Sequence, residues 1–142
     1  MEEKEVLDQF LKGFDCAQIV LSDVSKSLDI DKKTANKVAA CFGAGMFEGE
    51  TCGAVTGALM AIGLKYGHYL PDDGESKGLN IQKQMEFKYK FLEKYDSVIC
   101  KNLLGYDISN PVDAEKIHEN NLLNTFCPKV VSETTKILDE IL

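Results

Sequence analysis

The sequence predicts an all-α fold, a single-domain bundle of about six or seven helices over residues 1–142, with a glycine-rich loop before the fourth helix. Apolar residues recur at three- and four-residue intervals along nearly the whole chain, which is the spacing of one helix face. Strict alternation, typical of strands, is rare, and there are only three prolines. A length of 142 residues fits one domain.

Capping residues place the first helices. A first short helix is expected around residues 6–11, ended by Gly13. Asp15 is a good N-cap for a second helix, and Gln18 stands where a capping box requires it. Asp31 predicts the start of a third helix, ended by Gly43.

The fourth helix is expected to follow the glycine-rich loop GAGMFEGE, residues 43–50. Thr51 is its expected N-cap, and the helix should run over residues 52–66 until Gly67 ends it. Gly53 and Gly57 lie on one face of this helix, where each glycine costs about 1 kcal/mol relative to alanine. We therefore expect a neighbouring helix to approach this face closely, bringing a second cysteine near Cys52. Gly53, Ala54 and Gly57 are also candidates for cofactor binding.

The second half of the chain predicts three more helices. A long amphipathic helix should follow the turn at residues 70–76 and end at Gly105. Its apolar stripe consists of Ile81, Met85, Leu92, Ile99 and Leu103. A short helix is expected after Asn110, with Pro111 at its first position, and a last helix over residues 128–142.

Charge and composition exclude some functions. The formal net charge is −7 without a clustered Lys/Arg stripe, so nucleic-acid binding is not expected. The acidic N-terminus lacks the features of a signal peptide, and the uncharged run at residues 51–64 is too short to span a bilayer. We therefore expect a cytoplasmic protein without membrane insertion, in which five cysteines serve metal binding, redox chemistry or plain burial.

The cysteines fall at informative places. Cys16, Cys52 and Cys127 lie at expected helix N-termini, where unpaired N–H groups and the helix dipole favour the thiolate. Cys100 is expected in the last turns of the long helix, and Cys41 in the last turn of the third, where the dipole opposes a thiolate. No pair has CxxC spacing, so any shared site must be assembled by the fold.

Four segments resemble one known family: FDCAQIVL, FGAGMFEGETCGAVTGALMAIGLKYG, ICKNLLG and FCPKVV. In this order they are similar to the C_GCAxxG_C_C family of redox-active proteins, and CGAVTG at residues 52–57 is the most specific element. The family's four cysteines fall on Cys16, Cys52, Cys100 and Cys127 and leave out Cys41. The resemblance implies a small cytoplasmic bacterial or archaeal protein with redox activity.

Three functions remain open at this point. The first is thiol–disulfide exchange or electron transfer with an unknown redox partner, with Cys52 as the expected attacking thiol. The second is a zinc or iron–sulfur site held by the same four cysteines. The third is a helical interaction module with structural cysteines and an exposed apolar seam that forms a homodimer. For the first two, the four cysteines should lie on one side of the bundle, with at least one pair in disulfide reach and Cys41 dispensable.

Overall fold

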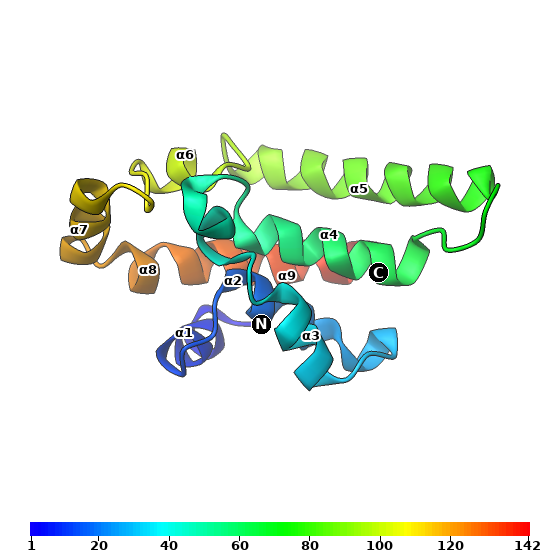
Figure 1. The fold of residues 1–142 in the computed structure, drawn as a ribbon, viewed down its shortest axis with the longest axis horizontal. Helices are drawn as coiled ribbons and strands as arrows, with labels where there is room; N and C mark the ends of the chain where they lie inside the picture. Colours follow the sequence, from blue (N-terminus) through cyan, green and yellow to red (C-terminus); the bar gives the residue numbers. More distant parts are fainter.

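The structure is a computed structural model that describes residues 1–142, and it confirms the all-α prediction (Figure 1). It contains nine α-helices and no strand. Their bounds are α1 Glu3–Leu11, α2 Cys16–Val24, α3 Lys32–Ala39, α4 Gly53–Tyr66, α5 Gly74–Lys94, α6 Cys100–Leu104, α7 Pro111–Glu119, α8 Leu122–Thr125 and α9 Cys127–Ile141. No helix is both long and apolar enough to cross a membrane.

The predicted N-caps of α2 and α3 are confirmed, whereas α3 ends at Ala39, earlier than the predicted stop at Gly43. The Asp15 side chain accepts a hydrogen bond from the Gln18 N–H at 3.3 Å, and the Gln18 side chain accepts one from the Asp15 N–H at 3.1 Å. The Asp31 side chain accepts one from the Thr34 N–H at 2.9 Å. These caps depend on residues three positions apart, which is why the sequence alone was sufficient to place them.

The long fifth helix was predicted wrongly. It ends at Lys94, and the chain is extended at Tyr95 before α6 starts at Cys100. The reason is a non-local pairing in which Thr51 and Ile99 form an isolated antiparallel bridge. Because α8 is a further short helix, the count rises from the predicted six or seven to nine.

The N-cap of α4 also differs from the prediction by one residue. Cys52 itself is the N-cap, and Thr51 lies in the bridge with Ile99 instead. The Cys52 N–H donates to the carbonyl oxygen of Val98 at 2.7 Å, and the Cys52 carbonyl oxygen accepts from the Thr56 N–H at 3.0 Å. Residue 52 is therefore held by the neighbouring segment on one side and by the helix on the other.

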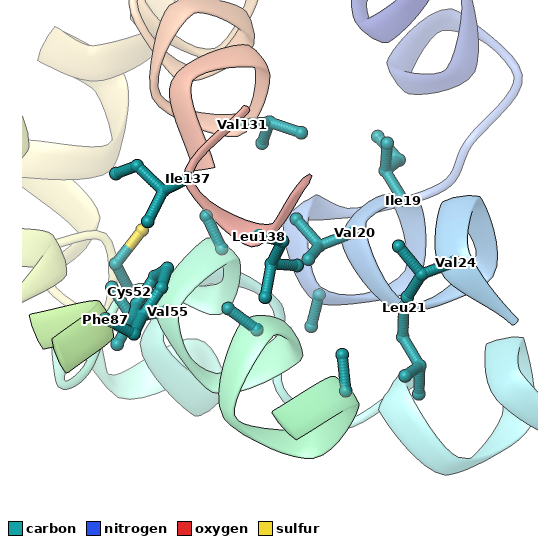
Figure 2. Packing of buried hydrophobic residues seen from close by; sticks show 14 of the residues in the cluster. Ile19, Val20, Leu21, Val24, Cys52, Val55, Phe87, Val131, Ile137 and Leu138 are labelled. Atoms are coloured by element: carbon teal, nitrogen blue, oxygen red, sulfur yellow. The ribbon is translucent and has the colours of Figure 1, made fainter. Parts of the chain in front are cut away.

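The centre of the protein is formed by α2, α4 and α9, with α5 packed on α4 and α9 (Figure 1). Figure 2 shows side chains from these helices, among them Val20, Val55, Phe87 and Leu138, packed in one core. A second, smaller cluster contains Cys100, Leu104 and Ile117. The part of the chain from α6 to α8 therefore forms one end of the bundle.

The predicted apolar stripe of α5 does not face the core. Ile81, Met85 and Leu92 are 44%, 65% and 50% exposed, whereas Phe87 and Phe91 are fully buried. The helix carries apolar residues on two sides, and its contacts with α4 and α9 select the side with the phenylalanines.

The close approach expected at α4 is confirmed and involves α2. A β-carbon added at Gly57 would lie 2.9 Å from the Ala17 carbonyl oxygen and 3.1 Å from the Ala17 α-carbon. One added at Gly53 would lie 3.0 Å from the β-carbon of Cys16. The glycines thus let α4 lie against the start of α2, and this contact brings Cys16 towards Cys52.

A matched pair of substitutions in α4 tests this contact. Gly57→Ala is expected to destabilise the protein by about 1–3 kcal/mol because the added methyl group meets backbone atoms of α2. Gly63→Ala has open space and is expected to stabilise it by about 0.5–1 kcal/mol through helix propensity. Urea unfolding of both variants measures the difference, and equal effects of the two would contradict the tight α2–α4 contact.

Candidate functional site

A cavity of about 290 Å³ opens at the end of the bundle where the two hydrophobic clusters meet. All four cysteines of the predicted set line it: Cys16, Cys52, Cys100 and Cys127. Its other walls come from Phe10, Gly13, Phe14, Asp15, Ala44, Phe47, Gly53, Leu103, Leu104, Ile108, Leu123, Asn124, Phe126 and Val130. The fold therefore brings together four cysteines that are far apart in sequence.

Each of these cysteines lies at the N-terminus of a helix. Cys16, Cys100 and Cys127 are the first residues of α2, α6 and α9, and Cys52 is the N-cap of α4. For Cys127 and Cys52 the prediction is displaced by one residue. For Cys100 it is wrong, because this residue begins a helix instead of lying in the last turns of one.

The antiparallel bridge between Thr51 and Ile99 places Cys52 and Cys100 on the same side of the two paired segments. The Cys52 N–H donates to the Val98 carbonyl oxygen at 2.7 Å, and the Cys100 N–H donates to the Glu50 carbonyl oxygen at 2.6 Å. Neighbouring residues on extended strands point to opposite faces. Cys52 and Cys100 therefore both lie on the face opposite Thr51 and Ile99, and this face forms a wall of the cavity.

Cys16 and Cys127 form the most closely interacting pair. Side-chain hydrogen bonding between them lowers the pKa of Cys127 below its usual value, against the opposing effect of burial. The same interaction is the main reason why the pKa of Cys16 is raised well above its usual value, with burial as the second cause. The arrangement thus fits a Cys127 thiolate that accepts a hydrogen bond from the Cys16 thiol.

Cys52 and Cys100 behave differently because burial is their main influence. It raises the pKa of Cys52 to about 11, although the N–H groups of Ala54 and Val55 act in the opposite direction. It raises the pKa of Cys100 to about 12, with a further contribution from the charge of Cys52. The structure therefore does not favour Cys52 as the attacking thiol. Burial raises the pKa of Cys52 more than the N–H groups at the start of α4 lower it, and these N–H groups were the reason for the prediction.

The glycine-rich loop forms part of the mouth of the cavity. Ala44, Gly45, Met46 and Phe47 all have positive φ, between 51° and 62°, so the chain makes one left-handed turn. This conformation costs roughly 1–2 kcal/mol per non-glycine residue. Phe47 lines the cavity while remaining 60% exposed. The strained turn holds an aromatic ring between the cavity and solvent.

The residues suggested for cofactor binding have mainly a packing role. Ala54 is fully buried, and the backbone of α2 occupies the space beside Gly57. Gly53 alone of the three lines the cavity.

The donor geometry of the cysteines bears on the metal alternative. No three His, Cys, Asp or Glu side chains are grouped so that they could hold a metal ion. The four thiols share one cavity, but their arrangement in this structure does not fit a zinc ion or a cluster with three or more protein ligands.

Cys41 lies outside the site. It is exposed and does not line the cavity. It follows the end of α3 at Ala39 instead of lying in the last turn of that helix, as the sequence predicted. The aromatic walls of the cavity, which include Phe14, Phe47 and Phe126, were not predicted from the sequence. A signal was present in the segments FDC and FCP, where a phenylalanine stands one or two residues before a cysteine.

The fold and the site together define a small all-helical protein with four cysteines around one apolar cavity. The chain belongs to the C_GCAxxG_C_C family, whose model is described as "Putative redox-active protein (C_GCAxxG_C_C)" and matches residues 14–141. The description agrees with the resemblance found in the sequence. No curated protein and no solved structure matches the chain.

Proposed function

We propose that this protein is a thiol–disulfide redox protein in which Cys127 is the attacking thiol and Cys16 the resolving thiol. The observation that carries the proposal is that Cys16 and Cys127, which are far apart in sequence, line one cavity at the N-termini of α2 and α9. Their interaction there lowers the pKa of Cys127 and raises that of Cys16. A thiolate is the nucleophile in disulfide exchange, and a second thiol beside it completes the reaction.

The first step forms a mixed disulfide. The Cys127 thiolate attacks one sulfur of a disulfide RS–SR, a bond forms between Cys127 and that sulfur, and RS⁻ leaves and takes up a proton. The negative charge on Cys127 disappears in this step.

The second step follows from the loss of that charge. The interaction with Cys127 is the main cause of the raised pKa of Cys16, so Cys16 ionises more readily once the mixed disulfide has formed. The Cys16 thiolate then attacks the sulfur of Cys127 and releases the second RSH. Two thiols have given two electrons, and RS–SR has become two RSH.

Cys52 and Cys100 remain protonated during these steps because of their raised pKa values. They lie in the same cavity. Two further thiols are thus available to a Cys16–Cys127 disulfide, and exchange with them transfers the oxidation to a second pair of cysteines.

Mass spectrometry of the oxidised protein tests the proposal. One equivalent of a small disulfide, added to the reduced Cys41→Ser protein, is expected to give a Cys16–Cys127 disulfide as the first intramolecular product. The Cys41→Ser background removes intermolecular products from the exposed cysteine. A first disulfide that involves Cys52 or Cys100 would contradict the assignment.

Metal content measured on protein purified without oxygen separates this proposal from the metal alternative. A protein free of stoichiometric zinc and iron is expected. A stoichiometric metal that protects all four cysteines from alkylation would overturn the assignment of Cys127 as a free thiolate.

A further inference from the structure

We propose that the cavity beside the four cysteines binds the substrate, and that this substrate is a small, uncharged, apolar disulfide with about two rings. The inference rests on the proposed thiol–disulfide function. It adds the chemical class of the molecule that exchanges with Cys127, which neither the family description nor the cysteine pattern supplies.

The walls of the cavity select apolar groups. Fourteen of its 18 lining residues are hydrophobic, and they include Phe10, Phe14, Phe47 and Phe126. The cavity lies where the two hydrophobic clusters of the protein meet. Its walls therefore consist of side chains from the edges of these two clusters. Transfer of an apolar group from water into such a site is favourable.

The volume of the cavity limits the size of the substrate group that it can bind. An apolar cavity of about 150 Å³ is sufficient to bind benzene. The cavity described here has about 290 Å³, so it can hold a group with about two aromatic rings or an aliphatic group of similar volume. A folded peptide segment would not fit inside it.

The absence of cationic side chains in the cavity walls disfavours an anionic substrate. None of the 18 lining residues is Lys, Arg or His, and the charged groups among them, the carboxylate of Asp15 and the proposed thiolate of Cys127, are both negative. The helix N-termini favour negative charge, but Cys52 and Cys100 are buried, and burial raises the pKa of both thiols. A carboxylate on the substrate would therefore enter without a cationic partner.

The reaction in this cavity is the one derived above, with the substrate as the oxidant. The Cys127 thiolate and the Cys16 thiol lose two electrons and one proton and become a disulfide. The uncharged disulfide gains these two electrons, this proton and a second proton from water, and becomes two uncharged thiols. The reverse reaction oxidises the corresponding dithiol.

A matched pair of reagents tests the inference on the unaltered protein. The neutral disulfide 4,4′-dithiobis(benzamide) and the dianionic 4,4′-dithiobis(benzoate) have nearly the same shape. Each rate of oxidation of the reduced protein is divided by the rate of the same reagent with N-acetylcysteinamide, which removes the difference in intrinsic reactivity. The normalised rate is expected to be at least about tenfold higher for the neutral reagent, since two uncompensated charges are kept out of the cavity.

Two variants separate the cavity from the overall charge of −7. Leu123 lines the cavity and is 41% exposed, whereas Leu11 is 71% exposed and lies outside it. Leu123→Asp is expected to slow the neutral reagent about tenfold because it places a carboxylate on an apolar wall. Leu11→Asp changes the net charge equally and is expected to change the rate less than about twofold.

The outcomes distinguish the two levels of the proposal. If both reagents form the Cys16–Cys127 disulfide at equal normalised rates, the thiol–disulfide function stands and the inference about the substrate is wrong. A higher normalised rate for the dianion also overturns it. If neither reagent oxidises Cys127 and Cys16, the proposed function itself is wrong, and the inference fails with it.

Discussion

Replacement of Cys127 by Ser is expected to slow the fastest thiol reaction of the cavity at least about tenfold at pH 8. At this pH a thiol with a pKa of about 11, such as Cys52, is about 0.1% ionised. An ordinary thiol, with a pKa of about 8.5, is about one-quarter ionised. The higher intrinsic nucleophilicity of the more basic thiolate recovers about a factor of ten. A difference of about twentyfold remains in favour of an ordinary thiol over Cys52. The pKa of Cys127 is lowered rather than raised, mainly by its hydrogen bonding with Cys16, so the same order is expected for Cys127 and Cys52.

Alkylation by iodoacetamide, followed residue by residue with mass spectrometry, measures this effect. The control is Cys16→Ser, because serine can still donate a hydrogen bond to the Cys127 thiolate. In this variant Cys127 should stay reactive, but its mixed disulfide with a small reagent should accumulate because no resolving thiol is present. If Cys127→Ser and Cys16→Ser slow alkylation equally, the distinct roles of the two residues are wrong.

The pH dependence has a defined sign. A lowered pKa means that Cys127 becomes a thiolate at a lower pH than an ordinary cysteine, so its alkylation rate should reach a plateau first as the pH rises. The alkylation of Cys52 should keep increasing up to about pH 11, where its thiolate forms. Alkylation of Cys52 at lower pH than Cys127 would restore the interpretation drawn from the sequence alone.

The difference between Cys52 and Cys127 shows what a helix terminus can predict. The sequence placed both residues at or near N-termini, and the structure agrees to within one residue. The pKa of a thiol at a helix N-terminus also depends on how deeply the thiol is buried and on which side chains lie beside it. Burial dominates at Cys52, and the partner Cys16 dominates at Cys127. Neither the burial of a thiol nor the identity of its neighbour is determined by the residues adjacent to it in the sequence.

Cys100 shows the same limit for backbone structure. Its helix starts where the segment before it pairs with residues 50–52, almost fifty positions away. Periodicity within α5 and α6 gave no sign of this interruption, since apolar residues continue across it. By contrast, the capping box at Asp15 and Gln18 is complete within four residues and could be predicted.

The cavity could be predicted only in part. The family pattern selected the four cysteines, and the tight face of α4 indicated that one neighbour would be near Cys52. The aromatic walls come from α1, the glycine-rich loop and the segments beside α2 and α9. Their convergence depends on the packing of the whole bundle. Size, apolar character and lack of cations are therefore properties of the fold, and these are the properties that define the proposed substrate.

The side of α5 that faces the core predicts a large effect of one substitution on the free energy of unfolding. Phe87→Ala should destabilise the protein by about 3–5 kcal/mol, because a fully buried ring is lost and a cavity remains. Its ring contacts that of Phe91, with centroids 6.0 Å apart, so part of the aromatic packing is lost with it. Met85→Ala, two residues away on the same helix, should change stability by no more than about 0.5 kcal/mol because Met85 is 65% exposed.

Urea unfolding of the two variants measures both changes in free energy. Should Phe87→Ala leave too little folded protein, Phe87→Leu retains most of the buried volume and should cost less than half as much as the alanine substitution predicted above. The stripe predicted from the sequence would give the opposite order, with Met85 in the core and Phe87 nearly neutral. A loss at Met85 equal to that at Phe87 would mean that the exposed side of α5 is also buried in solution. The order of the two values therefore tests which of the two apolar sides of α5 packs against α4 and α9.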